Sequence, residues 1–128
     1  MSALQAITTD GAPAALGAYS QAVKANGFVF VSGQLGIDPT TGELAGSGAG
    51  EQAAQALRNI SRFLEAAGCG TDRAVRATIY LADVNDFGVV DAQYARVFSG
   101  SVRPARVALG GNEIPKGALV EIDAIAVE

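Results

Sequence analysis

The sequence contains no histidine and only one cysteine, Cys69, among its 128 residues. Zinc, haem and iron–sulfur sites need several histidine or cysteine ligands, so we expect no metal site in a single chain. Centres that pair serine or cysteine with histidine are excluded for the same reason. One cysteine also permits no disulfide within the chain, which favours a reducing compartment and predicts a cytoplasmic protein.

Charged residues are scarce, at 17% of the chain against about 25% in typical soluble domains, while 49% of residues are hydrophobic. The net charge of −4 disfavours nucleic acid as a partner. No stretch approaches the roughly 18 apolar residues of a membrane span, and the amino terminus does not resemble a signal peptide. A chain with so few charges is predicted to cover part of its surface with copies of itself.

No linker, repeat or long run of charge divides the chain, so residues 1–128 are predicted to form a single domain. Apolar and β-branched runs predict strands, which are Leu4–Thr8, 28–32, Ala74–Leu81, Arg106–Leu109 and Ala118–Val127. The glycines of Gly33–Gly36 indicate a β-bulge or a close approach of two backbones. Asp38–Gly42 has the composition of a turn.

Two amphipathic helices are predicted between these strands. In Glu51–Ala67, apolar residues recur every three or four positions, and the polar residues, including Gln52, Gln55 and Asn59, fall off that face. The second helix is capped by Asp83 or Asn85, and its apolar stripe is Phe87, Val90, Tyr94 and Val97 or Phe98. This order of elements predicts an α+β fold with two layers, in which both helices cover one face of a mixed sheet. The other face is predicted to pack against a neighbouring subunit.

Alternation along two strands assigns their side chains to faces. Val75, Ala77, Ile79 and Leu81 are predicted to point the same way. Glu121 and Asp123 share one face of the last strand, about 7 Å apart. Buried carboxylates are costly unless they are paired, so these acids either meet water or a basic partner near a sheet edge or serve a function. We favour a function for Glu121 and leave Asp123 open.

Arg106 starts an apolar strand after a loop that contains a proline. It is either a structural ion-pair partner or a clamp for an anion, because its planar fork holds a carboxylate at two points. Tyr19 follows a glycine-rich loop, where a tyrosine commonly serves packing alone. Ser32 and Gly33 offer a hydroxyl and backbone N–H groups at a strand end, or simply a bulge.

Taken in order, five segments resemble the Rid family, the reactive intermediate deaminases that are also called YjgF proteins. The resemblance covers nearly the whole chain. Its segments are Ala12-Pro13 with Gly17-Ala18-Tyr19-Ser20-Gln21-Ala22, Val31-Ser32-Gly33-Gln34-Leu35-Gly36-Ile37-Asp38-Pro39, Glu51-Gln52-Ala53 with Ala56-Leu57-Arg58-Asn59-Ile60, Pro104-Ala105-Arg106, and Ile114-Pro115-Lys116-Gly117-Ala118-Leu119-Val120-Glu121-Ile122.

The resemblance implies a chorismate-mutase-like fold and a homotrimer with its sites in the clefts between subunits. It implies hydrolysis of 2-imino and 2-enamino acids, such as 2-aminoacrylate and 2-iminopropanoate, to 2-oxo acids and ammonia, with no cofactor. Arg106 would bind the substrate carboxylate, Glu121 would orient water or take its proton, and Tyr19 would close over the site. The expected substrate-binding residues are Ser32, Gly33, Asp91 and Ala108.

Four positions depart from the family pattern, and these are Ala18, Asp91, Val107 and Ala108. An acid at position 91 either repels a carboxylate substrate or pairs with Arg106 and changes the substrate preference. The alternative function is a trimer without catalytic activity that binds small carboxylates or acts as a chaperone or regulator. An endoribonuclease or translation inhibitor is disfavoured by the net negative charge and by the absence of histidine.

Overall fold

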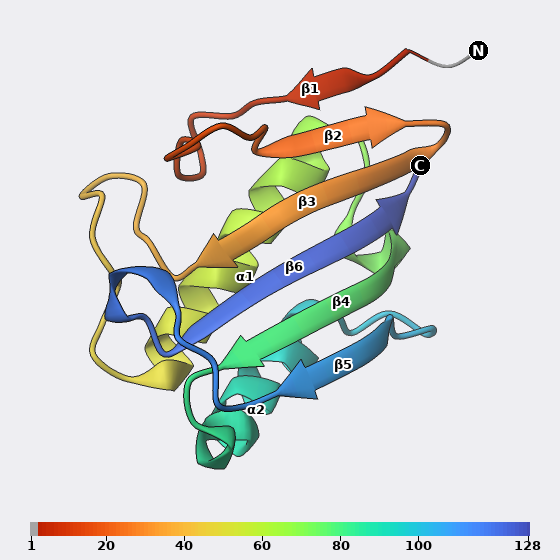
Figure 1. Cartoon of the computed structure of the whole chain (residues 1–128). Coiled ribbons are helices and arrows are strands. Elements are labelled where there is room, and N and C mark those ends of the chain that lie inside the picture. Colours follow the sequence, from red (N-terminus) through yellow and green to blue (C-terminus); the bar gives the residue numbers. More distant parts are fainter. Residues whose placement is uncertain (1–2) are drawn as a thin grey trace.

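A single six-stranded sheet carries two helices on one of its faces (Figure 1), as a computed structural model that describes residues 3–128 shows. The strand order is β1-β2-β3-β6-β4-β5, and only the β4–β5 pair is parallel. The predicted mixed sheet with both helices on one face is therefore confirmed. The elements are β1 (Gln5–Ile7), β2 (Ala22–Ala25), β3 (Phe28–Leu35), α1 (Ala49–Ala66), η1 (Thr71–Arg73), β4 (Ala74–Leu81), η2 (Val84–Asp86), α2 (Phe87–Val97), β5 (Ala105–Leu109), η3 (Pro115–Gly117) and β6 (Val120–Val127).

Strand β6 lies in the middle of the sheet and pairs with β3 on one side and β4 on the other. Its side chains alternate as predicted. Val120 and Ile122 are fully buried beneath the helices, whereas Glu121 and Asp123 point to the other face and are half-buried. The central position of β6 makes the sheet-edge interpretation of these two acids wrong.

Helix α1 supplies much of the core, because Leu57, Ile60 and Phe63 are fully buried against the sheet. The prediction that its polar residues lie off the buried face is wrong for Gln52, Gln55 and Asn59, which are all buried. Asn59 Nδ2 donates to the carbonyl oxygens of Ile37 at 3.0 Å and Leu35 at 3.3 Å. Gln52 Nε2 likewise donates to the Gly46 carbonyl, and Gln55 Nε2 donates to Asn59 Oδ1, so each buried amide has a hydrogen-bond partner.

Strand β2 was not predicted, because its four residues, one of them a lysine, are too few to show the alternation of a strand. The signal for it was the Asn26-Gly27 pair, whose φ angles of 52° and 81° form the tight turn of a β2–β3 hairpin. Strand β3 is longer than predicted and runs to Leu35, with the expected bulge between Val31 and Gln34. The expected close approach occurs at Gly36, where a Cβ would lie 2.6 Å from the Gln52 Cα of α1.

The start of β4 corrects one predicted side chain. A register shift between Ala74 and Arg76 turns Val75 away from the core, and Val75 is 41% exposed. Asp83 caps η2 by accepting the N–H of Asn85 at 2.9 Å, so the cap precedes α2 by a short turn. Helix α2 then connects β4 to β5, which a parallel pair of strands requires.

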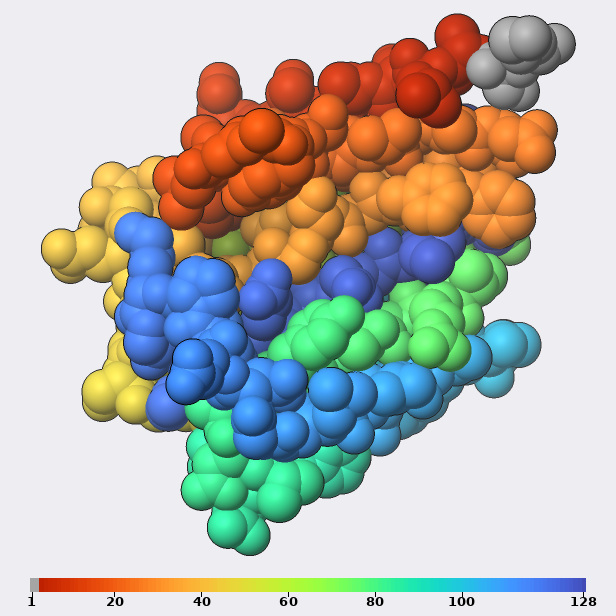
Figure 2. Space-filling model, viewed as in Figure 1, coloured from red at the N-terminus to blue at the C-terminus, as the bar shows by residue number. Residues whose placement is uncertain are grey.

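The sheet face opposite the helices is open, and Figure 2 shows it. Apolar side chains are exposed there from both ends of the sheet, including Phe28, Phe30, Val107 and Leu109. The rings of Phe28 and Phe30 lie 6.1 Å apart between centroids. The homo-oligomer that this face suggests stays a prediction. No helix within residues 3–128 is both long and apolar enough to cross a membrane.

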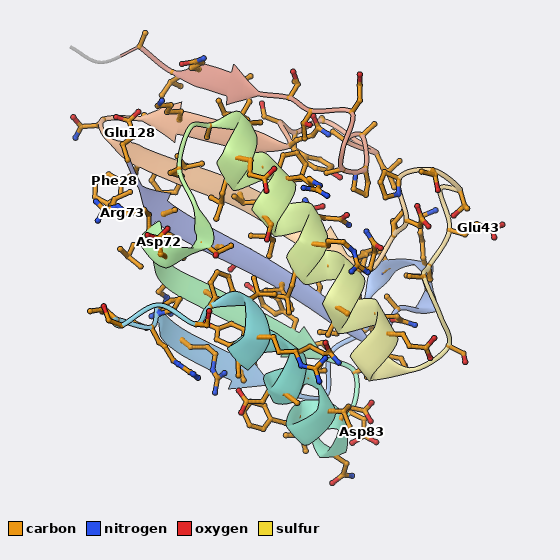
Figure 3. The ribbon with its side chains drawn as sticks, turned by 180° about the vertical axis from the view of Figure 1, so that it is seen from behind. Phe28, Glu43, Asp72, Arg73, Asp83 and Glu128 are labelled. Carbon is orange, nitrogen blue, oxygen red and sulfur yellow. The ribbon has the colours of Figure 1, made fainter. Side chains whose placement is uncertain are left out.

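Figure 3 views the molecule from the helix side, with Arg73, Glu128 and Phe28 close together at one end. Arg73 Nη2 donates to the Glu128 carbonyl oxygen at 2.9 Å. The Glu128 carboxylate pairs with Lys24 Nζ at 2.5 Å. These contacts hold the chain beyond β6 against η1 and β2.

We expect Asn59→Ala to lower the free energy of unfolding by about 2 kcal/mol, because two carbonyl groups lose their donor. Denaturant unfolding at a fixed protein concentration measures the change. The control is Glu65→Ala on the exposed side of α1, where a change within about 0.5 kcal/mol is expected. Equal effects of the two substitutions would contradict the role given to Asn59.

Candidate functional site

A cleft of about 460 Å³ opens on the exposed sheet face, where the loop before β2 and the η3 turn meet the ends of β3 and β6. We call it the acid cleft, and it contains four of the predicted site residues, Tyr19, Ser32, Gly33 and Glu121. The complete lining is Leu16, Tyr19, Ser32, Gly33, Leu35, Pro115, Lys116 and Glu121.

Ser32 and Tyr19 are fixed by local hydrogen bonds. The bulge in β3 places Ser32 beside the preceding loop, where its Oγ donates to the Ser20 carbonyl at 2.7 Å and its N–H donates to the Gln21 carbonyl at 3.1 Å. The Tyr19 hydroxyl accepts the N–H of Leu16 at 3.2 Å, and the residue is 50% exposed. Because that hydroxyl accepts in this contact, its own proton remains available to a ligand.

The Glu121 carboxylate lies directly over Gly33. A Cβ at position 33 would overlap Glu121 Oε2, so any residue other than glycine would displace the carboxylate from this position. Partial burial raises the pKa of Glu121, and the nearby charge of Asp123 raises it further. Within residues 3–128, no hydrogen-bond donor engages this carboxylate. Glu121 therefore combines a raised pKa with a free acceptor, which suits a group that takes a proton from water.

Asp123, the second acid of β6, is already paired. It accepts the Thr78 N–H at 3.1 Å and the Tyr80 hydroxyl at 3.3 Å, both from the neighbouring strand β4. Its charge is the main cause of a raised pKa at Tyr80. These contacts favour the structural alternative for Asp123, with a secondary effect on the titration of Glu121.

Arg106 lies against helix α2, in a group that we call the arginine cluster, formed by Phe87, Asp91, Tyr94 and Arg106. Its Nη1 pairs with Asp91 Oδ1 at 2.5 Å. Its Cζ lies 5.1 Å from the ring centroid of Phe87 and 4.8 Å from that of Tyr94. The Tyr94 hydroxyl is buried, has no hydrogen-bond partner among the described residues, and has a raised pKa because of burial.

The acid cleft and the arginine cluster lie on opposite faces of the sheet. Arg106 pairs in register with Ala77, which is fully buried under the helices. Ala108 has the same orientation, two residues further along β5. Glu121 pairs with Tyr80 on the open face. One chain therefore brings together Tyr19, Ser32, Gly33 and Glu121, and separately Asp91, Arg106 and Ala108.

Sequence reasoning missed Lys116 as a residue of the cleft, although its segment had been identified. Lys116 has a φ of 62° and Gly117 a φ of 64°, and this turn brings the lysine to the cleft rim. The Lys-Gly pair after a proline was the available signal. Within the described residues, no group of three or more His, Cys, Asp or Glu side chains is arranged to hold a metal ion.

The chain matches the protein-family model described as Endoribonuclease L-PSP over residues 9–128. A rat protein named 2-iminobutanoate/2-iminopropanoate deaminase is 49% identical over 122 residues, which cover 95% of this chain and 88% of that protein. These matches extend across both the acid cleft and the arginine cluster.

Two solved structures have a closely similar fold. The crystal structure of RidA from an Antarctic Psychrobacter is 43% identical, with a TM-score of 0.92 and coverage of 97% of this chain and 99% of that chain. The crystal structure of TdcF from E. coli with bound serine is 33% identical, with a TM-score of 0.91 and coverage of 97% and 98%.

The raised pKa of Glu121 predicts a pH-dependent effect of Glu121→Gln. A carboxyl whose pKa is higher in the folded state than in the unfolded state lowers the stability of the protein once it ionises. This cost is absent when the pH is below the unfolded-state pKa, and it grows as the pH rises through the folded-state pKa. We expect Glu121→Gln to raise the thermal midpoint relative to the native chain at pH 7 but not at pH 4. A difference that is the same at both pH values would contradict the assigned titration.

Proposed function

Because the chain belongs to the Endoribonuclease L-PSP family, which is the YjgF/Rid family, we propose that it hydrolyses 2-imino and 2-enamino acids to 2-oxo acids and ammonia. The name of the rat relative supports this activity. The structural observation that carries the proposal is the Glu121 carboxyl, which has a raised pKa and faces a cleft beside a free tyrosine proton. We also propose that residues 1–128 act as one domain.

The reaction consumes one water for each imine. The water oxygen adds to the carbon of the C=N bond, and its proton passes to the Glu121 carboxylate. Glu121 passes this proton to the nitrogen, and the hydroxyl proton of the resulting carbinolamine follows by the same route. The C–N bond then breaks, which leaves the C=O group of the 2-oxo acid and ammonia. An enamine first becomes the imine by taking a proton at its terminal carbon and giving one N–H proton back to the donor. Tyr19 is the proposed donor for this step, since its hydroxyl proton is not used by Leu16.

Arg106 is the proposed partner of the substrate carboxylate, because guanidinium and carboxylate form paired hydrogen bonds. Arg106 and Glu121 of one chain face opposite sides of the sheet, so we propose that one site takes these residues from two chains. Strand β5 is an edge strand whose residues are all exposed, and the acid cleft opens on the apolar face of the sheet. A cyclic homotrimer that seats β5 of one chain beside the cleft of the next would complete each site.

The remaining predicted residues have proposed roles that follow from their positions. The Ser32 hydroxyl and the backbone at Gly33 line the cleft next to Glu121 and would contact the substrate nitrogen. Ala108 lies two residues from Arg106 on the same side of β5 and would leave room for the substrate side chain. Asp91 holds Arg106.

A carboxylate-binding protein without catalytic activity is the competing function. The structure of TdcF with bound serine favours it, since that protein holds a small carboxylate in the same fold. The two functions predict the same ligand class and differ only in turnover, so the activity assay separates them.

We expect the chain to accelerate 2-oxo acid release from imines generated in situ by an amino-acid oxidase. Arg106→Ala should reduce kcat/KM by about a hundredfold or more, because the substrate carboxylate loses its charged partner. The control is Arg62→Ala, which removes an exposed arginine that pairs only with Glu65. If the native chain matches the spontaneous hydrolysis rate for several imines, the carboxylate-binding function replaces the enzymatic one.

Sedimentation of the native chain should give one species at three times the chain mass of 12.9 kDa. Leu109→Asp should shift this species toward the monomer, because it places a charge on the exposed apolar edge strand. Val89→Asp adds the same charge at an exposed site on the helix side and should leave the mass unchanged. A native chain that sediments near 12.9 kDa would refute the shared site.

A further inference from the structure

The ion pair between Arg106 and Asp91 has a feature that the proposed chemistry does not use. Phe87, Asp91 and Tyr94 lie four and three residues apart, so they form one stripe along α2 that faces Arg106. The two rings lie against the guanidinium, and the carboxylate occupies its Nη1. Residues of α2 thus hold the Arg106 guanidinium in place, and Asp91 occupies one of its hydrogen-bond donors, Nη1.

Arg106 still has donors for a ligand. A guanidinium carries five N–H groups in one plane, and those not used by Asp91 can pair with a carboxylate. The Arg106 side chain is 27% exposed and that of Asp91 is 43% exposed, so both reach solvent at the same place. Any carboxylate that binds Arg106 therefore lies beside the Asp91 carboxylate.

The Asp91 carboxylate therefore places a negative charge next to the guanidinium that would bind the substrate carboxylate. Two carboxylates bound to one guanidinium are within about 8 Å of each other, given hydrogen bonds of about 2.9 Å on either side of the fork. At this distance, in a partly exposed site, their repulsion changes affinity by about three- to tenfold. A second carboxylate on the ligand adds a further repulsion from Asp91, which is weaker in proportion to its greater distance from that residue.

We infer that Asp91 is a specificity-determining residue that holds Arg106 in place and selects against substrates with a second negative charge. The inference rests on the proposed function and names its substrate class, which is imino acids with neutral or cationic side chains. Asp91 acts on the substrate through its charge and on Arg106 through the hydrogen bond. The two effects are separable by substitution.

Asp91→Asn separates them, because an asparagine oxygen still accepts from Nη1 while the charge is removed. The assay compares the imines of glutamate and glutamine, which have nearly the same shape and differ by one charge. We expect the native chain to prefer the glutamine imine. Asp91→Asn should reduce this preference about two- to threefold, through a lower KM for the glutamate imine.

Asp91→Ala removes the hydrogen bond as well, so it should also lower kcat for the neutral imine. Glu65→Gln is the matched control, since it removes one carboxylate charge from an exposed ion pair with Arg62 on α1. This control should leave the substrate preference as it is in the native chain. An unchanged preference in an active Asp91→Asn protein would overturn the inference and leave the proposed function standing.

Equilibrium binding tests the inference without turnover. Calorimetric titration with 2-oxobutanoate and 2-oxoglutarate compares a monoanion with a dianion. Asp91→Asn should strengthen binding of the dianion about threefold more than that of the monoanion. If the chain showed this difference in binding but did not hydrolyse imines, the enzymatic proposal would be rejected and the role of Asp91 would stand. Equal changes for both ligands, or no binding of either, would overturn the role of Asp91.

Discussion

The side chains of β6 alternate between two environments, and the site depends on that alternation. Val120 and Ile122 are held under α1 by the hydrophobic effect, which fixes the register of the strand. A shift of one residue would place Glu121 in the core, at a large cost for an uncompensated charge. The burial of one face of β6 therefore sets the position of the carboxyl on the other face. The partial burial that raises the pKa of Glu121 follows from the same packing.

Periodicity in the sequence was sufficient to predict the parts of the fold that repeat. The alternation of β6, the apolar face of α1, the bulge in β3 and the turn at Asp38 all follow from local rules, and the structure confirms them. Where the pattern is broken by a single residue, prediction failed. Val75 is turned outward by a register shift that alternation cannot reveal. Asn59 is buried because distant carbonyl groups need its amide, and no local pattern encodes them.

The residues of the candidate site stay a prediction, and the structure shows how the fold arranges them. Arg106 and Glu121 were identified from their unusual places in apolar strands. Their location on opposite sheet faces depends on the register in which β5 pairs with β4, with Arg106 opposite Ala77, and alternation within β5 alone does not set that register. Lys116 was missed because its place in the cleft depends on a positive φ rather than on any strand or helix. Of the two alternatives for the acid at position 91, the structure shows the ion pair with Arg106.

The contact between Gly33 and the Glu121 carboxylate links two positions that are far apart in the chain. A side chain at position 33 forces the Glu121 carboxylate to move from the place it occupies over the glycine, whereas a shorter residue at position 121 leaves that space free. In evolutionary terms, position 121 can change first while the glycine is kept, whereas a side chain that appears first at position 33 displaces the acid. Sequences that descend from this fold and abandon the acid are thus the ones in which the glycine is free to vary.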